Sequence, residues 1–157
     1  MQLTMKFGGT SVGSAAALRR TVDLIAQRVS SGDEVVAVVS AMGTQPVKVT
    51  DLLLEGAGAA LTGDKTRPDG VAVQLRQAHH EAVDGLLEPG QRRSALLAEV
   101  DAFIERYSDL CGAVRVLGEL TPRALDTIAG MGEQMSARIV AAALEAAGRE
   151  AVAIDAT

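Results

Sequence analysis

The sequence predicts an α/β fold with a mainly parallel sheet, and three observations support this class. Residues 2–7 alternate between apolar and polar side chains, as strands do, and a glycine-rich turn and a helical pattern follow them. Residues 34–40 (EVVAVVS) form a short apolar, β-branched run of the kind that is buried on both faces of a parallel sheet. A strand, a helix and a strand in this order make a βαβ unit, whose crossover is almost always right-handed.

The composition fits one domain, or part of a larger one, and argues against several classes of function. The 157 residues are 48% hydrophobic, enough for a substantial core, and only 2% aromatic, so that core is aliphatic. A net charge of −5 without a basic run argues against nucleic acid as a partner. Charges interrupt the apolar runs well short of the about 18 residues that a membrane span needs. The single cysteine, Cys111, cannot form an internal disulfide, which fits a reducing cytoplasm.

The turn after the first predicted strand, residues 6–13 (KFGGTSVG), has the features of a phosphate site. Its glycines let backbone N–H groups face an anion, the next helix N-terminus adds partial positive charge, and Lys6 adds a full cation. A glycine turn that only packs is an equally good interpretation of this shape alone. The stretch is not a P-loop, because Ser14 stands where that motif has lysine. Nor do the adjacent Gly8 and Gly9 fit the dinucleotide fingerprint.

The helix after this turn is predicted over about 14–31, with Ser14 as its cap and Gly32 as its stop. Residues 40–43 (SAMG) follow the second predicted strand. Because ligands of parallel sheets bind at the carboxyl ends of the strands, SAMG is expected beside the Lys6 turn. Ser40 has an ordinary alternative role there, which is to satisfy local backbone groups.

The middle of the chain is predicted to be helical. Thr50 is a plain N-cap candidate for a helix over about 51–61, and residues 63–70 (GDKTRPDG) are predicted to form an exposed, mobile loop. Two further helices, about 71–87 and 91–111, are separated by EPG and form a hairpin. The two histidines are adjacent and cannot share a helix face as metal ligands, so no protein-held metal is expected.

Thr121 and Pro122 mark the start of another helix, as its cap and its first-turn proline. Gly130 and Gly132 are predicted to interrupt it before a second helix over about 133–147.

Glu133 would then lie near a helix N-terminus, where a carboxylate is stabilised without any ligand. Gly148 ends that helix, and residues 150–155 are predicted to form a third strand.

Three stretches together resemble the motifs of a known family and occur in its order. They are KFGGTSVG at 6–13, SAMG at 40–43 with a Thr-Asp pair at 50–51, and GELTPR at 118–123 followed by GEQMS at 132–136. The wording resembles the aspartate kinases, in the amino acid kinase family, from residue 5 to about residue 154. The resemblance implies a three-layer sandwich with a mainly parallel sheet, of which residues 1–157 would be the N-terminal, substrate-binding part. The link at 44–49 is longer than is usual in the family.

The resemblance implies transfer of the γ-phosphoryl group of ATP to the β-carboxylate of L-aspartate, with Mg²⁺ carried by the ATP. This is the first step toward lysine, threonine and methionine. Lys6 would be catalytic and stabilise charge on the transferring group, while the Gly8 and Gly9 amides, with Ser11, would cradle it. Phosphoryl transfer depends mainly on positioning and charge stabilisation, which suits these residue types.

By similarity, three further residues would bind the substrate. Ser40 would lie near the reacting groups, Thr50 would help to fix the aspartate, and Glu133 would pair with its ammonium group. This role for Glu133 competes with the capping role that the sequence alone favours.

The family also has a nucleotide lobe and, in most members, regulatory domains, and no stretch of these 157 residues resembles them. The polypeptide is therefore expected to be inactive alone, and to form a homo-oligomer or pair with a complementary C-terminal polypeptide. Two alternatives stay open: another amino acid kinase acting on a different acid, such as glutamate, or a non-catalytic binding or assembly module. The pairing of GELTPR and GE with SAMG favours aspartate.

Overall fold

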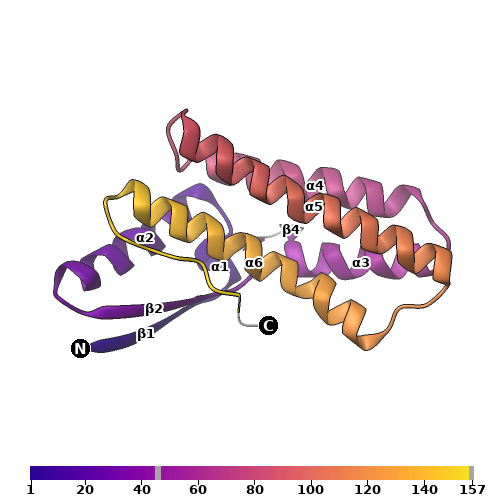
Figure 1. Cartoon of the computed structure of the whole chain (residues 1–157), viewed down its shortest axis with the longest axis horizontal. Helices are drawn as coiled ribbons and strands as arrows, with labels where there is room; N and C mark the ends of the chain where they lie inside the picture. The colour runs from indigo at the N-terminus through magenta and orange to yellow at the C-terminus, as the bar shows by residue number, and fades with distance from the viewer. Residues whose placement is uncertain (45–46, 156–157) are drawn as a thin grey trace.

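A computed structural model describes residues 1–44 and 47–155 and shows an α/β fold with a parallel strand pair (Figure 1). The middle of the long link at 44–49, including Pro46, lies outside the described residues. The elements in chain order are β1 (Gln2–Phe7), α1 (Gly9–Val12), α2 (Ala15–Ser30), β2 (Glu34–Val39), β3 (Gly43–Thr44), β4 (Val47–Lys48), α3 (Val49–Leu61), α4 (Thr66–Asp84), α5 (Gln91–Leu117) and α6 (Pro122–Ala146).

The predicted βαβ unit is confirmed. β1 and β2 pair in parallel, in a register that runs from Gln2 opposite Glu34 to Phe7 opposite Val39. The connecting helix α2 begins where the sequence predicts, because the Ser14 hydroxyl accepts a hydrogen bond of 3.2 Å from the Ala17 amide. Gly32 follows α2 with a positive φ of 85°, which a residue with a side chain rarely adopts.

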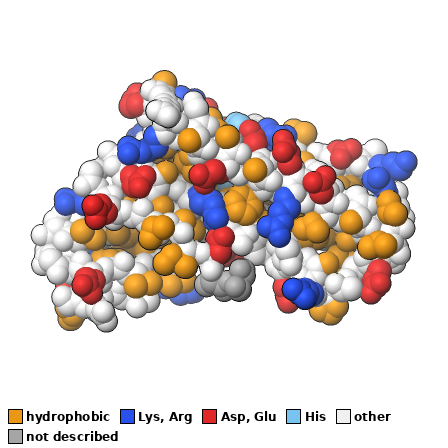
Figure 2. All heavy atoms as spheres, in the orientation of Figure 1, with side chains coloured by type: hydrophobic (Ala, Val, Ile, Leu, Met, Phe, Trp, Pro, Cys, Tyr) orange, Lys and Arg blue, Asp and Glu red, His pale blue; other side chains and the backbone are white. Residues whose placement is uncertain are grey.

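Only one face of the two-stranded sheet is covered among the described residues. Side chains along β1 and β2 alternate in exposure, and α2 and α6 pack on the covered side. Val36 and Val38, on the other side, are 64% and 48% exposed, so the expectation that residues 34–40 are buried on both faces is wrong for this chain. The strands have the composition of an inner layer, but the described residues supply helices for one side only. Figure 2 shows hydrophobic side chains interspersed with charged ones across the visible face of the molecule.

Helix α6 runs through both predicted interruptions and connects the two parts of the molecule. It packs against α3 and α5 in the helical part and against α2 and β2 beside the sheet (Figure 1). The predicted break at Gly130 and Gly132 is therefore wrong. Each glycine costs a helix roughly 1 kcal/mol, whereas burying one large apolar side chain returns roughly 1.5–3 kcal/mol. The apolar face of α6 buries several such side chains at 0–1% exposure, among them Ile128, Met131, Met135 and Ile139.

Helix α4 also begins earlier than predicted, at Thr66, so the loop before it is shorter than residues 63–70. The Asp64 carboxylate accepts hydrogen bonds from the amides of Thr66 (2.8 Å) and Arg67 (3.2 Å) and so caps the first turn. Pro68 is tolerated in this turn, because amides there have no partner within the helix. The helical hairpin of α4 and α5 is confirmed, and α5 continues to Leu117.

The segment at 150–155 is not a strand, contrary to prediction. No backbone hydrogen bond joins it to β2 or to any other strand among the described residues. It is fixed by a side chain instead, because Arg138 donates two hydrogen bonds, of 2.8 and 3.0 Å, to the Asp155 carboxylate. Val152 and Ile154 remain 79% and 76% exposed.

His79 on α4 is fully buried and makes stability depend on pH. Burial lowers the pKa of its imidazole. Its Nδ1 lies 2.7 Å from the Leu75 carbonyl oxygen, which can only accept, so Nδ1 carries the proton of the neutral ring. Because the unfolded chain has the ordinary histidine pKa near 6.5, it takes up a proton first as the pH falls. The free energy of unfolding therefore decreases as the pH falls below about 6.5.

We expect the urea midpoint to be lower at pH 5.5 than at pH 7.5, and His79→Leu to remove most of this difference. His80→Gln is the matched control, since His80 is only partly buried and lies 3.0 Å from an Asp101 oxygen. The carboxylates whose pKa is lowered by partners, such as Asp155 beside Arg138, act only below about pH 4. An unchanged pH dependence in the His79 variant would remove His79 as its source.

Candidate active site

The turn at residues 40–43, called the SAMG turn below, lies beside the glycine stretch at the carboxyl ends of β1 and β2, as predicted. The Ser40 amide donates to the Phe7 carbonyl (3.1 Å), which continues the pairing of the strands by one residue. Gly9 approaches the turn so closely that a Cβ atom on it would lie 2.9 Å from the Ala41 carbonyl oxygen. Glycine is therefore required at this position for the two backbones to meet.

The glycine stretch folds as one helical turn, α1, rather than as an open loop. Gly8 precedes the turn, and its carbonyl accepts a 2.9 Å hydrogen bond from the Ser11 amide. The Ser11 carbonyl in turn accepts from the Thr21 hydroxyl (2.8 Å), which fixes the turn against α2. The predicted roles of Gly8 and Ser11 toward a phosphate stay predictions.

A hollow of about 350 Å³ lies between these elements, and we call it the strand-end hollow. It brings together three of the predicted site residues, Gly9, Ser40 and Thr50. Its full lining is Gly9, Thr10, Ser40, Ala41, Met42, Gly43, Lys48, Thr50 and Asp51. A volume near the lower end of the roughly 300–1,000 Å³ typical of ligand sites suits one small molecule.

Thr50 reaches this hollow from the first turn of α3, not from its cap. Helix α3 begins at Val49, with Lys48 before it, so the expectation that Thr50 is the N-cap is wrong. Val49 is 1% exposed, and its amide donates to the Met42 carbonyl (3.0 Å). This burial against the SAMG turn starts the helix earlier than the sequence suggests and leaves the Thr50 side chain half-buried at the hollow.

Glu133 lies in the middle of α6, so the helix-terminus explanation for a carboxylate at this position is wrong. Its neighbour Gly132 is packed against the site: a Cβ atom there would lie 2.7 Å from the Ala41 Cβ and 3.0 Å from the Val49 Cγ1. Glu133 is half-buried and makes no hydrogen bond or ion pair with any of the described residues. Glu133 is not part of the lining of the strand-end hollow, and its predicted role toward the substrate stays a prediction.

Lys6 is exposed and is not part of the lining of the strand-end hollow. Its neighbour Phe7 is buried on the covered face of the sheet, and Lys6 opposes exposed Val38, so Lys6 lies on the uncovered face. The predicted catalytic role of Lys6 stays a prediction.

Comparison with known proteins assigns the chain to a family. The sequence model that describes the amino acid kinase family matches residues 1–157.

The chain belongs to the amino acid kinase family.

Similar sequences within this amino acid kinase family are aspartokinases. The chain is 29% identical to an aspartokinase of Candida albicans and 30% identical to one of Schizosaccharomyces pombe, each over 98% of its length. It is 33% identical, over 97% of its length, to the chloroplastic aspartokinase 3 of Arabidopsis thaliana. The chain spans only 28%, 30% and 25% of these three relatives, respectively.

Two solved structures share the fold of this member of the amino acid kinase family. Escherichia coli aspartokinase III in complex with aspartate and ADP superposes with a TM-score of 0.77 at 21% identity, over 94% of this chain and 30% of that one. Clostridium acetobutylicum aspartate kinase superposes with a TM-score of 0.64 at 23% identity, over 92% and 29%. The likeness confirms the predicted α/β class.

Three polar residues that line the strand-end hollow were not assigned a role from the sequence: Thr10, Lys48 and Asp51. Thr10 and Asp51 lie within the motif stretches at 6–13 and 50–51, but no role was predicted for either residue. Lys48 lies in the long link at 44–49, and only the pairing of β3 with β4 brings it back to the SAMG turn.

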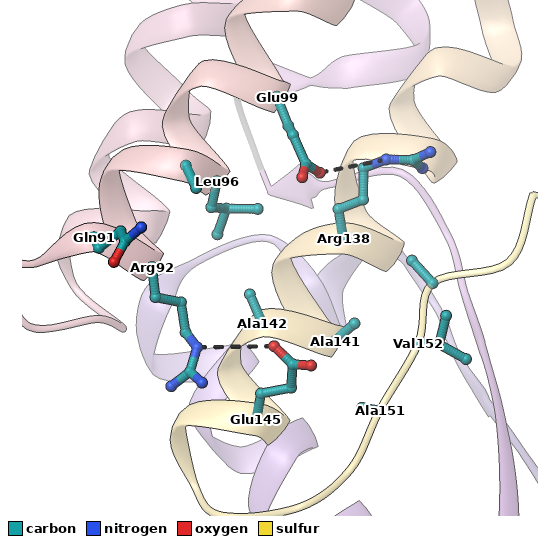
Figure 3. A pocket seen from close by; sticks show the side chains of 12 residues that line it. Gln91, Arg92, Leu96, Glu99, Arg138, Ala141, Ala142, Glu145, Ala151 and Val152 are labelled. Carbon is teal, nitrogen blue, oxygen red and sulfur yellow. Dashed lines mark ion pairs between the residues drawn. The ribbon is translucent and has the colours of Figure 1, made fainter.

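A second hollow, of about 460 Å³, lies between α5, α6 and residues 151–153 (Figure 3). Two ion pairs cross it: Arg92 to Glu145 at 3.7 Å and Arg138 to Glu99 at 3.8 Å. Arg138 also lies 4.7 Å above the centre of the Phe103 ring. The charges around this hollow neutralise one another and join α5 to α6. None of the predicted site residues lines it.

Two structural findings bear on metals and membranes. In the described part of the chain, no group of three or more His, Cys, Asp or Glu side chains is placed to hold a metal ion. No helix among residues 1–44 and 47–155 combines the length and the apolar character needed to cross a bilayer.

Proposed function

We propose that the chain is the N-terminal, substrate-binding part of an aspartate kinase and that the strand-end hollow binds L-aspartate. The observation that carries this proposal is the packing at Ala41. Gly9 meets the Ala41 carbonyl and Gly132 meets its Cβ, so the three motif stretches converge on one residue. The names of the similar proteins, and the aspartate in the complex of the Escherichia coli enzyme, support the choice of substrate.

The reaction we propose is phosphoryl transfer to the β-carboxylate of aspartate. The Ser40 and Thr50 hydroxyls can donate hydrogen bonds to substrate carboxylates, and Glu133 pairs with the ammonium group. Lys6, at the end of β1, stabilises charge on the phosphoryl group, and the Gly8 and Gly9 amides with Ser11 contact its oxygens.

ATP, when bound, supplies the phosphoryl group and carries Mg²⁺ with it. The residues fit this arrangement, since Asp51 is the one carboxylate among the described residues that line the hollow. Mg²⁺ bound mainly by phosphate oxygens and water needs few protein ligands.

We propose that turnover needs more structure than these 157 residues provide. A hollow of about 350 Å³ accommodates one small substrate, whereas transfer requires the carboxylate and the nucleotide to be held in line. The exposed Val36 and Val38 of β2 offer an apolar surface for a complementary C-terminal polypeptide or a second copy. A cytoplasmic location is our proposal too; the one cysteine is a free thiol, although some relatives are chloroplastic.

The test is calorimetric titration of L-aspartate into the chain and into its Glu133→Gln variant. Glutamine keeps the shape of the side chain and loses the charge, so the affinity should fall by about 1.5–3 kcal/mol, or about 10- to 100-fold. Unfolding by urea should hardly change, because Glu133 has no partner among the described residues.

Succinate, which lacks the ammonium group, is the control ligand, and Glu133→Gln should not weaken its binding, because the variant removes a negative charge from beside an anionic ligand. Tighter binding of L-glutamate than of L-aspartate would favour the alternative amino acid kinase. Equal aspartate affinity in both proteins would exclude Glu133 from the substrate site. No binding of either amino acid would favour the assembly-module alternative.

A further inference from the structure

Lys48 is brought to the strand-end hollow by a feature that the motifs do not contain. β3 and β4 form a two-residue antiparallel pair in which Gly43 opposes Lys48. The adjoining hydrogen bond from the Val49 amide to the Met42 carbonyl, 3.0 Å long, fixes the end of this pair against the SAMG turn. Lys48 is thus held at the hollow through the backbone of β4, and it is part of the lining.

Lys48 is the one cationic residue among the described residues that line the hollow. Among the described lining residues only Lys48 and Asp51 are charged, and Lys6 is not in the lining. The Lys48 ammonium and the Asp51 carboxylate lie 3.9 Å apart, beyond hydrogen-bond length, and their side chains are 57% and 71% exposed. Such an exposed ion pair contributes little to stability. An incoming anion can therefore replace the Asp51 carboxylate as the partner of the Lys48 ammonium.

We propose that Lys48 binds a small oxyanion in the strand-end hollow and so contributes to substrate recognition. The inference rests on the proposed function and adds a binding residue to that site. The Lys48 ammonium supplies three donors as a point charge, and Thr10 and Thr50, whose hydroxyls can donate, line the same space. In the first turn of α3 the amides after that of Val49 have no acceptor within the helix. This donor set suits a carboxylate of the amino acid or a terminal phosphate, which share the chemistry of anionic oxygens.

The experiment titrates L-aspartate and inorganic phosphate separately into the 157-residue chain and four variants, one of which is a control. Lys48→Ala should lower the affinity for the anion that Lys48 binds by about tenfold, and Lys48→Arg should retain part of that affinity. Asp51→Asn should tighten binding about two- to fivefold, because it removes the competing carboxylate. The opposite signs of these two changes separate a charge effect from a loss of structure.

Lys65→Ala is the matched control, since Lys65 is exposed, lies between α3 and α4, and is not in the lining. Its binding constants should stay within about twofold of the wild type. The probe that responds to Lys48→Ala identifies the group bound, a carboxylate or a phosphate.

Unchanged affinities for both probes in Lys48→Ala would overturn the assignment of Lys48, while aspartate binding itself would leave the proposed function intact. Conversely, phosphate binding that depends on Lys48, without any aspartate binding, would support Lys48 and count against the proposed substrate. Failure of the wild-type chain to bind either probe would overturn the assignment as well.

Discussion

Replacing Gly132 by alanine is expected to destabilise the protein by about 1–3 kcal/mol and to weaken L-aspartate binding at the same time. The new Cβ would lie 2.7 Å from the Ala41 Cβ, where carbon atoms prefer about 3.5–4.0 Å. Neither contact can yield easily: Ala41 is buried with its carbonyl oxygen packed against Gly9, and Val49 is buried at 1% exposure. The helix would have to move away from the SAMG turn, and Glu133 would move with it.

Gly130→Ala is the matched control, in the same helix and two residues away. A Cβ atom there meets nothing within 4 Å, so alanine should be neutral or stabilise by about 0.5–1 kcal/mol. Urea unfolding and aspartate calorimetry on both variants check the expectation. Equal behaviour of the two variants would show that the contact with Ala41 does not set the position of α6.

Gly56→Ala on α3 should have the larger effect on stability, a loss of about 3 kcal/mol or more. A Cβ atom at this position would overlap the hydroxyl oxygen of Tyr107, whose side chain is fully buried. A rigid buried ring cannot rotate away as an exposed, flexible side chain could. The core between α3 and α5 would therefore have to open.

Gly58→Ala, two residues further along the same helix, should instead stabilise slightly, since its Cβ meets nothing within 4 Å. Adding Tyr107→Phe to Gly56→Ala removes the colliding oxygen and should recover part of the loss, although the ring carbon Cζ would still be only 3.1 Å away. Thermal or urea unfolding of the wild type, the two single variants and the double variant gives the coupling. A double variant no more stable than Gly56→Ala would place the strain elsewhere.

The features predicted correctly from the sequence are those fixed by residues close together in the chain. Ser14 and Thr121 cap their helices through bonds to amides three residues on, so the residue type and the following pattern suffice. The strands β1 and β2 are marked by their own composition and spacing. The convergence of the SAMG turn with Gly9 followed from a general rule about parallel sheets.

The features predicted wrongly depend on partners distant in sequence. Gly132 looks like a helix breaker until its contact with Ala41 is known, and Thr50 looks like a cap until Val49 is seen buried against the SAMG turn. Residues 150–155 have a strand pattern, but no strand pairs with them among the described residues. Likewise, Lys48 enters the hollow only through the pairing of β3 with β4. Tertiary contacts decided each of these cases over local propensity.

Because α6 is unbroken, a displacement at one of its ends can be transmitted to the other. Its 25 residues give a length of about 38 Å at 1.5 Å per residue. Near its middle, Gly132 packs directly against Ala41, so this contact is the expected pivot point of the helix. One arm reaches into the helical part and the other lies beside the sheet. If either end of α6 tilts, the helix should turn about this contact, which is next to Glu133. The Glu133 carboxylate would then rotate with little translation, while the two ends of the helix would move furthest.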